Sequence, residues 1–251
     1  MHKFFAKTQF LGKNVLFLSQ CHSTNDMAAD LLKDKPQVEG TTIITHDQQN
    51  GRGQRGNSWE SEPGKNATFS VILRPTLVSA QNQFQLHLIS TLAIHNTLFP
   101  ILGKDLKIKW PNDIYYRNRK IGGILIENIL KGPHIEFSII GIGLNLNQTQ
   151  FSNLHATSIL DITGEELEIN DLIEQVLIQL EKKYLELKNG QLKMLEAQYM
   201  RRLYLFDQES TYETAGRAFS GKIIGVNSNG LLQIQEDEIV HQFAFKEVAY
   251  K

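Results

Sequence analysis

The stretch Gln-Gln-Asn-Gly-Arg-Gly-Gln-Arg-Gly-Asn-Ser-Trp, from Gln48 to Trp59, limits the folds that this chain can adopt. Its three glycines have the spacing of a dinucleotide-binding fingerprint and also of a phosphate-binding loop. Both motifs require a helix directly afterwards, whereas Pro63-Gly64 interrupts the following segment, and Asn57 stands where the phosphate-binding loop has lysine. The stretch therefore indicates neither fold. It predicts a loop whose backbone N–H groups and arginines approach an anion, although alone it is also typical of a mobile surface loop.

Length and composition describe an ordinary globular protein. The 251 residues suggest one large domain, or a large and a small one, and 41% are hydrophobic and 21% charged. A net charge of −1 creates no global field that would recruit nucleic acid or an anionic membrane. The single cysteine, Cys21, excludes an internal disulfide and fits a reducing compartment. We see neither a signal peptide nor a membrane span, and we expect a cytoplasmic protein.

Hydrophobic periodicity predicts alternating strands and helices in the larger part of the chain. Strands are expected at residues 15–18, 41–45, 67–73, 106–110, 114–116, 120–130 and 135–146. Helices are expected after Thr24 and at residues 80–99, 171–188 and 191–203, with Pro100 ending the second. The short connections between residues 106 and 146 imply antiparallel neighbours, which argues against a doubly wound parallel sheet.

The pattern changes near Leu203. Residues 219–226, 231–235 and 238–245 alternate like strands, and Asn229-Gly230 is a strong hairpin turn. We therefore expect two domains, 1–203 and 204–251. The smaller one is too short to be stable by itself and would dock on the larger one.

Two further motifs offer chemistry. Lys109-Trp110-Pro111-Asn112-Asp113 precedes a predicted hairpin whose second strand begins at Lys120. Separately, Pro-Asn-Asp is typical of a turn and a lysine at a strand start is typical of a solvated edge. Together they place an acid and an amine on adjacent strands. The segment Gly-Ile-Gly-Leu-Asn, from Gly141 to Asn145, ends the following strand, and its simplest interpretation is a bulge or close backbone packing.

Taken in order, these motifs resemble those of the biotin–protein ligases. Ser23-Thr24-Asn25, the glycine–arginine stretch with Trp59, Lys109–Asp113 with Lys120, and Gly141–Asn145 follow that family's order and approximate spacing. The resemblance implies an α+β fold with a mixed, largely antiparallel sheet and helices on one side, like a class II aminoacyl-tRNA synthetase. A small C-terminal SH3-like β-barrel would follow. Because the family's DNA-binding winged helix would precede the first strand, where few residues stand, we expect a short form without DNA-binding function.

The resemblance also implies an activity, which is that of a biotin–[acetyl-CoA-carboxylase] ligase. Biotin would be activated with ATP and Mg²⁺ to biotinyl-5′-AMP and transferred to a lysine of a biotin carboxyl carrier protein. The implied catalytic residues are Lys120, Arg52 and Asp113, with Asp113 also a weak Mg²⁺ ligand. The implied biotin-binding residues are Ser23, Thr24, Asn25, Gln48, Gly51, Arg52, Lys120, Gly122 and Gly123. The implied ATP- or adenylate-binding residues are Arg52, Arg55, Trp59, Lys109, Asn112, Asn145 and Lys251.

Some features leave alternatives open. Gln54 and Asn57 occupy positions where the family often has arginine, so adenylate retention and ATP affinity would both be weakened. A lipoate–protein ligase of similar fold is one alternative, and a non-catalytic RNA- or nucleotide-binding protein is another. The family also implies a possible homodimer, and we expect neither DNA nor membrane as a partner.

Overall fold

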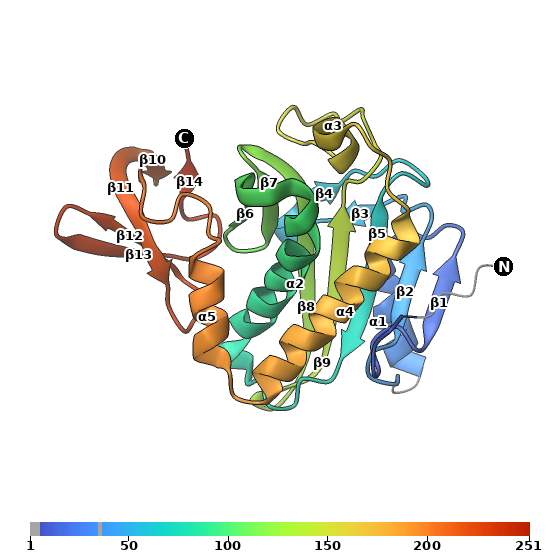
Figure 1. The fold of residues 1–251 in the computed structure, drawn as a ribbon. Helices are drawn as coiled ribbons and strands as arrows, with labels where there is room; N and C mark the ends of the chain where they lie inside the picture. Colours follow the sequence, from blue (N-terminus) through green and yellow to red (C-terminus); the bar gives the residue numbers. More distant parts are fainter. Residues whose placement is uncertain (1–5, 35–36) are drawn as a thin grey trace.

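A computed structural model describes residues 6–34 and 37–251, without the side chain of Arg55. Its main feature is a seven-stranded sheet in the order β1-β2-β5-β9-β8-β7-β6 (Figure 1). Only β1 and β2 are parallel, and all other neighbours are antiparallel. The strands are β1 (Val15–Leu18), β2 (Thr42–Thr45), β5 (Ala67–Leu73), β6 (Leu106–Lys109), β7 (Asp113–Tyr116), β8 (Arg119–Lys131) and β9 (His134–Leu144).

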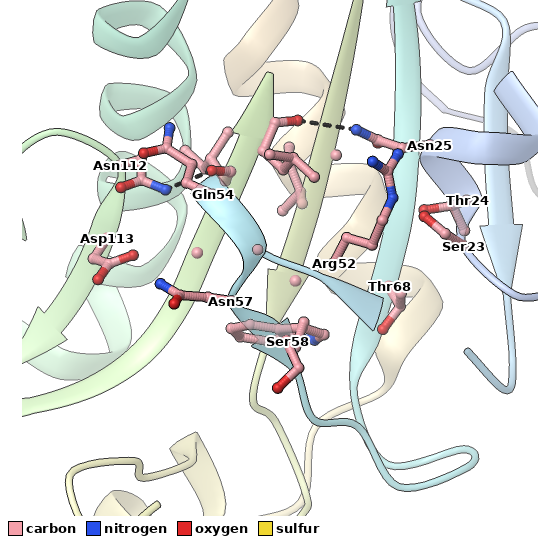
Figure 2. A pocket seen from close by; sticks show the side chains of 18 of the residues that line it. Ser23, Thr24, Asn25, Arg52, Gln54, Asn57, Ser58, Thr68, Asn112 and Asp113 are labelled. Carbon is pink, nitrogen blue, oxygen red and sulfur yellow. Dashed lines mark hydrogen bonds between the residues drawn. The ribbon is translucent and has the colours of Figure 1, made fainter. Parts of the chain in front are cut away.

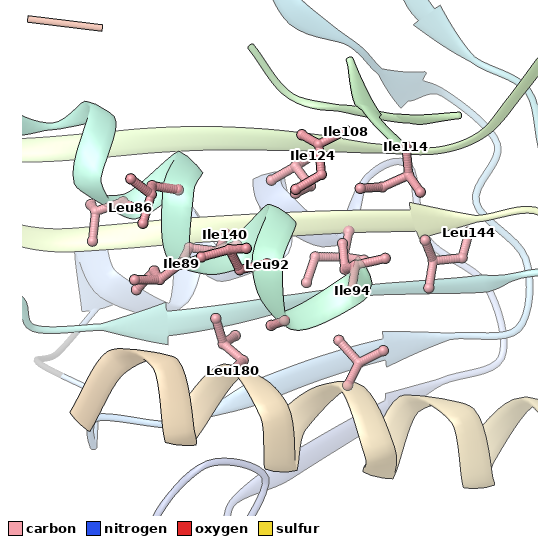
Figure 3. Packing of buried hydrophobic residues seen from close by; sticks show 14 of the residues in the cluster. Leu86, Ile89, Leu92, Ile94, Ile108, Ile114, Ile124, Ile140, Leu144 and Leu180 are labelled. Carbon is pink, nitrogen blue, oxygen red and sulfur yellow. The ribbon is translucent and has the colours of Figure 1, made fainter. Parts of the chain in front are cut away.

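Two long helices, α2 (Phe84–Leu102) and α4 (Ile169–Lys188), cover one face of this sheet (Figure 1). Buried side chains of both helices pack with alternate residues of the strands, such as Leu92, Leu180 and Ile140 (Figure 3). The shorter α1 (Thr24–Asp34) lies on the opposite face, where Ala28 packs with Ile43 and Ile72. The expected mixed, largely antiparallel sheet with helices against it is confirmed, and α1 is the helix on the second side.

The C-terminal residues form a separate five-stranded antiparallel sheet in the order β13-β12-β11-β10-β14, as an SH3-like barrel requires. Its strands are β10 (Glu209–Thr214), β11 (Arg217–Val226), β12 (Leu232–Glu236), β13 (Ile239–Phe243) and β14 (Ala249–Tyr250). This part docks on the large sheet through Trp110, whose indole Nε1 donates to the Gly230 carbonyl at 3.0 Å. The Trp110 ring also meets the Phe245 ring edge-on at 6.4 Å. The hairpin turn before β12 is therefore part of the contact between the two sheets.

One expectation about a single helix is wrong. Pro100 does not end α2, which continues to Leu102 before Gly103 closes it with a φ of 68°. Pro100 removes one helical hydrogen bond at a cost in stability, and burial of Leu98 and Leu102 in the core holds the last turn in place.

The segment Ala80–Asp105, which contains α2, is long and apolar enough to cross a membrane by length and composition, although 67% of its most apolar window is buried in the protein. The short helices α3 (Ile159–Thr163) and α5 (Leu192–Met200) complete the fold.

Candidate active site

The glycine–arginine stretch forms a small hairpin over the sheet rather than a plain loop. Strand β3 (Gly51–Arg52) pairs with β4 (Ser58–Trp59), and a 3₁₀ turn (Gln54–Gly56) joins them. A Cβ atom at Gly51 would overlap the carbonyl oxygen of Trp59, so this position requires glycine. In Figure 2 the hairpin crosses the space between Asn25 on one side and Asp113 on the other.

The floor beneath the hairpin is built by alternation along three strands. Residues in register form two rows across β5, β9 and β8, namely Thr68, Gly143 and Gly123, and Ser70, Gly141 and Leu125. Because successive strand residues point to opposite faces, the residues between them enter the core under α2 and α4, as Phe69 and Ile142 do. The site is therefore the second face of strands whose first face forms the core.

The two glycines of β9 leave room for side chains that lie on this floor. A Cβ at Gly143 would overlap the indole ring of Trp59, and a Cβ at Gly141 would overlap the amide of Asn25. Close packing is thus the reason for the Gly-Ile-Gly spacing, as the simplest interpretation of that motif predicted.

One end of the site holds the predicted acid and amine. Lys120 Nζ lies 2.6 Å from Asp113 Oδ1 and 5.7 Å from the Trp59 ring. Asp113 pairs with Gly123 in the sheet and Tyr115 pairs with Lys120, so Ile121 is an extra residue on β8. This bulge turns Lys120 onto the same face as Gly123, which lies three residues further along the strand.

The other end is a buried hydrogen-bond network. The backbone N–H of Thr24 donates to Gln48 Oε1 at 2.9 Å. Ser70 Oγ lies 2.6 Å from Asn25 Oδ1 and 2.7 Å from Thr24 Oγ1. Since an amide oxygen only accepts, Ser70 donates to Asn25 and accepts from Thr24. The predicted Ser23-Thr24-Asn25 motif is therefore held on the floor, and α1 begins at Thr24.

One cavity of about 100 Å³ joins the two ends. Predicted site residues on its wall are Ser23, Thr24, Asn25, Gln48, Arg52, Trp59, Asn112, Asp113, Lys120 and Gly123. Further wall residues, which sequence reasoning did not assign to a site, include Thr68, Leu125, Gly141 and Phe245. Trp59 Nε1 and Thr68 Oγ1 are buried and have no hydrogen-bond partner among the described residues, so both are free for a polar ligand.

Five predicted site residues lie off this wall, and the Arg55 side chain lies outside the described part of the chain. Gly122 faces the core and Gly51 faces Trp59. Lys109 Nζ lies 4.5 Å from the centres of both the Tyr115 and Tyr250 rings, where burial lowers its pKa. Asn145 is buried with Oδ1 unpartnered among the described residues, and Lys251 pairs with Glu213 at 2.7 Å.

The residues on the wall fit a divalent cation that arrives with a ligand better than a resident one. Among the described residues, no group of three or more His, Cys, Asp or Glu side chains could hold a metal. Asp113 is the one carboxylate on the described wall, and it already pairs with Lys120. Mg²⁺ bound to a nucleotide needs only one or two protein carboxylates beside the phosphates, which Asp113 could supply in part.

Comparisons with known proteins point to one family. A family model described as "Biotin/lipoate A/B protein ligase family" matches residues 17–145. The "Bifunctional ligase/repressor BirA" of Bacillus subtilis is 28% identical over 242 residues, which cover 94% of this chain and 74% of that protein. The "Biotin--[acetyl-CoA-carboxylase] ligase" of Mycobacterium tuberculosis is 30% identical over 180 residues, 69% of this chain and 65% of that protein.

A solved structure agrees in fold. The biotin protein ligase from Aquifex aeolicus, in complex with biotin and ATP, superposes with a TM-score of 0.79 and 26% identity. The superposition covers 95% of this chain and 99% of that one, so both sheets have their counterparts there.

Proposed function

Because the chain belongs to the biotin/lipoate A/B protein ligase family, we propose that it joins biotin to AMP from ATP and transfers biotin to a lysine of a biotin carboxyl carrier protein. One observation carries this proposal. A single cavity brings Arg52, Lys120 and Asp113 together, although these residues are far apart in the sequence. The enzyme is an ATP-dependent biotin ligase.

The buried end of the cavity suits biotin. The ureido ring of biotin is neutral and has two donors and an acceptor, which neutral side chains match without a buried charge. Ser23, Thr24 and Gln48 supply such groups, and the unpartnered Thr68 Oγ1 adds another. The Trp59 ring and Leu125 offer apolar surface for the rest of the molecule. Gly123 would serve biotin through the space that it leaves on the cavity wall. Gly51 and Gly122 face Trp59 and the core, so they would contribute only through their backbone.

The open end suits the reaction. A biotin carboxylate and the α-phosphate of ATP repel each other, and a fixed cation between them lowers that barrier. The Lys120 ammonium is that cation, and its pair with Asp113 holds it at the cavity wall. Mg²⁺ bound to ATP would add further charge stabilisation there. Arg55 and Asn112 would contact the phosphates, and the free Asn145 Oδ1 could accept a hydrogen bond from the adenine amine.

In the second step the acceptor lysine must lose a proton before it attacks the acyl-adenylate. Asp113, beside Lys120, would orient that amine and take up its proton, and AMP leaves as the amide forms. Phe245 of the C-terminal part reaches the cavity wall. Lys109 and Lys251 would have to leave their present partners, the Tyr115 and Tyr250 rings and Glu213, to contact a nucleotide. We assign residues 1–203 to catalysis and 204–251 to the barrel. A homodimer, a cytoplasmic location, and the lack of DNA and membrane partners stay predictions.

Pyrophosphate release tests the proposal. The protein is incubated with ATP and Mg²⁺ and with biotin, lipoate or neither, and then with a biotin-acceptor domain. We expect pyrophosphate only with biotin, and a mass increase on one acceptor lysine. Release with lipoate alone would assign the chain to the lipoate branch, and no release with either acid would contradict a ligase.

A further inference from the structure

The guanidinium of Arg52 is held by two carboxylates that the sequence motifs do not contain. Arg52 Nη2 lies 2.6 Å from Asp26 Oδ1 and 2.9 Å from Glu127 Oε2. Asp26 belongs to the first turn of α1 and Glu127 to strand β8. One side chain of the hairpin is thereby tied to a helix and to the central sheet at the same point.

Glu127 also connects Arg52 to the floor of the cavity. The same Oε2 atom accepts a hydrogen bond from Asn25 Nδ2 at 2.7 Å. Asn25 lies on Gly141 and accepts from Ser70 Oγ at 2.6 Å. A shift of the Arg52 strand therefore disturbs the residues on which a ligand would rest.

The charge balance at this point argues for holding the hairpin rather than for binding an anion. One guanidinium faces two carboxylates, so the group offers little net attraction to a phosphate or to a carboxylate substrate. The three side chains remain between 37% and 48% exposed. Ion pairs this exposed are weak and exchange readily. The cavity of about 100 Å³ is below the roughly 300–1,000 Å³ of most ligand pockets. A hairpin held by such exposed pairs can open to admit a substrate and close again afterwards.

We propose that Glu127 and Asp26 are positioning residues that hold the Arg52 strand over the cavity and so retain the acyl-adenylate until an acceptor arrives. This inference rests on the proposed function. The two carboxylates act through Arg52 and need no contact with the substrate. Their contribution falls on retention of the intermediate rather than on its formation.

The test uses Glu127→Gln, Asp26→Asn and the double variant in the full chain. Pre-formed biotinyl-adenylate is chased with excess biotin, and its release rate is measured beside the single-turnover rate of adenylate formation. We expect the double variant to release it about tenfold faster, because the combined energy of two exposed ion pairs corresponds to about a tenfold change in a rate. Formation should change less than about threefold. Asp30→Asn, which removes an exposed ion pair with Lys33 on the same helix, is the matched control.

A charge exchange separates positioning from a general structural effect. Arg52→Glu and Asp26→Arg should each release the intermediate faster. Their combination should recover much of the retention, since the exchanged guanidinium can pair with the new carboxylate and with Glu127, whose hydrogen bond from Asn25 is kept. No recovery in the combined variant, or wild-type release from the double variant, would overturn the proposal.

Limited trypsin digestion at the Arg52–Gly53 and Arg55–Gly56 bonds keeps the test independent of the proposed function. The double variant should be cut several-fold faster than the Asp30→Asn control. If the wild type makes no adenylate, the ligase proposal fails while this digestion still measures the hold on the hairpin. An unchanged rate of cleavage would show that Asp26 and Glu127 do not hold the hairpin in place. Faster cleavage with an unchanged rate of adenylate release would show that holding the hairpin does not retain the adenylate.

Discussion

The two faces of the seven-stranded sheet use the same strands for different purposes. On the face under α2 and α4, Phe69, Val71 and Ile140 are fully buried in one apolar core. On the other face, between the same positions, stand small or polar residues such as Ser70 and Gly143, which carry Asn25 and Trp59. Further along β5 this second face also packs Ile72 against α1. The large core therefore depends on one set of alternate residues, and the site lies on the other set. Changes on the two faces should affect different measurements.

The largest effect is expected on the site face. Lys120→Ala removes the cation beside Asp113, and the loss of one such electrostatic contact lowers a rate by about 10²–10³-fold. Single-turnover adenylate formation measures the loss, and urea unfolding checks that stability is retained. Lys131→Ala is the matched control, because this lysine of the same strand pairs with Glu136 at 3.7 Å, far along β8. Adenylate formation by Lys120→Ala at the wild-type rate would show that Lys120 has no part in the reaction.

The core face should show the opposite behaviour. Leu92 on α2 is fully buried against the sheet (Figure 3), and Leu92→Ala should lower the free energy of unfolding by about 2–5 kcal/mol. Urea unfolding measures this change. The rate of adenylate formation per folded molecule should stay within about twofold, because Leu92 lies on the far side of the sheet. A large loss of rate in the folded variant would mean that the two faces are coupled.

Acid should lower the free energy of unfolding through His95, a buried residue of α2. Burial, with Arg202 and Lys107 nearby, lowers the pKa of His95 to about 4. The unfolded histidine titrates near 6.5, so the stabilisation is complete above that pH and is lost as the pH falls towards 4. Between pH 7.5 and pH 5 the wild type should lose about 2 kcal/mol more than His95→Gln, which keeps a donor for the Leu106 carbonyl. Equal losses in urea unfolding would show that His95 is not the responsible group.

The same division explains what the sequence could predict. Apolar alternation marked the core face well, and β5 spans the predicted residues 67–73. Strand β10 was missed because Glu209–Thr214 contains a single large apolar residue, Tyr212. The order of the sheet, with β9 between β5 and β8, depends on pairings between distant segments that no local pattern specifies.

The site face was predictable only in part. The ordered motifs predicted that Arg52, Lys120 and Asp113 share one site, and the three residues do line one cavity. Their roles remain predictions. Glu127 was missed, although it is the one charged residue in the apolar run from Ile121 to Leu130 and so carried a signal. The bulge at Ile121 was not visible, and it decides which of the neighbouring residues face the cavity. A one-residue insertion reverses every side-chain direction beyond it.

The smallest expected effect distinguishes two glycines of one row. A methyl group at Gly143 would overlap the Trp59 ring, whereas at Gly123 it would lie 3.2 Å from the end of the flexible Lys120 side chain and 3.4 Å from Trp59. Gly143→Ala should therefore displace Trp59 and slow adenylate formation by about tenfold, or about 1.4 kcal/mol in the barrier. Gly123→Ala should slow it only about two- to threefold, because a lysine side chain can move aside. With both glycine variants made in a Trp110→Phe background, Trp59 is the one remaining tryptophan. Its emission maximum should shift more for Gly143→Ala than for Gly123→Ala. Equal rates and spectra for both would mean that the row of glycines provides no specific seat for the ring.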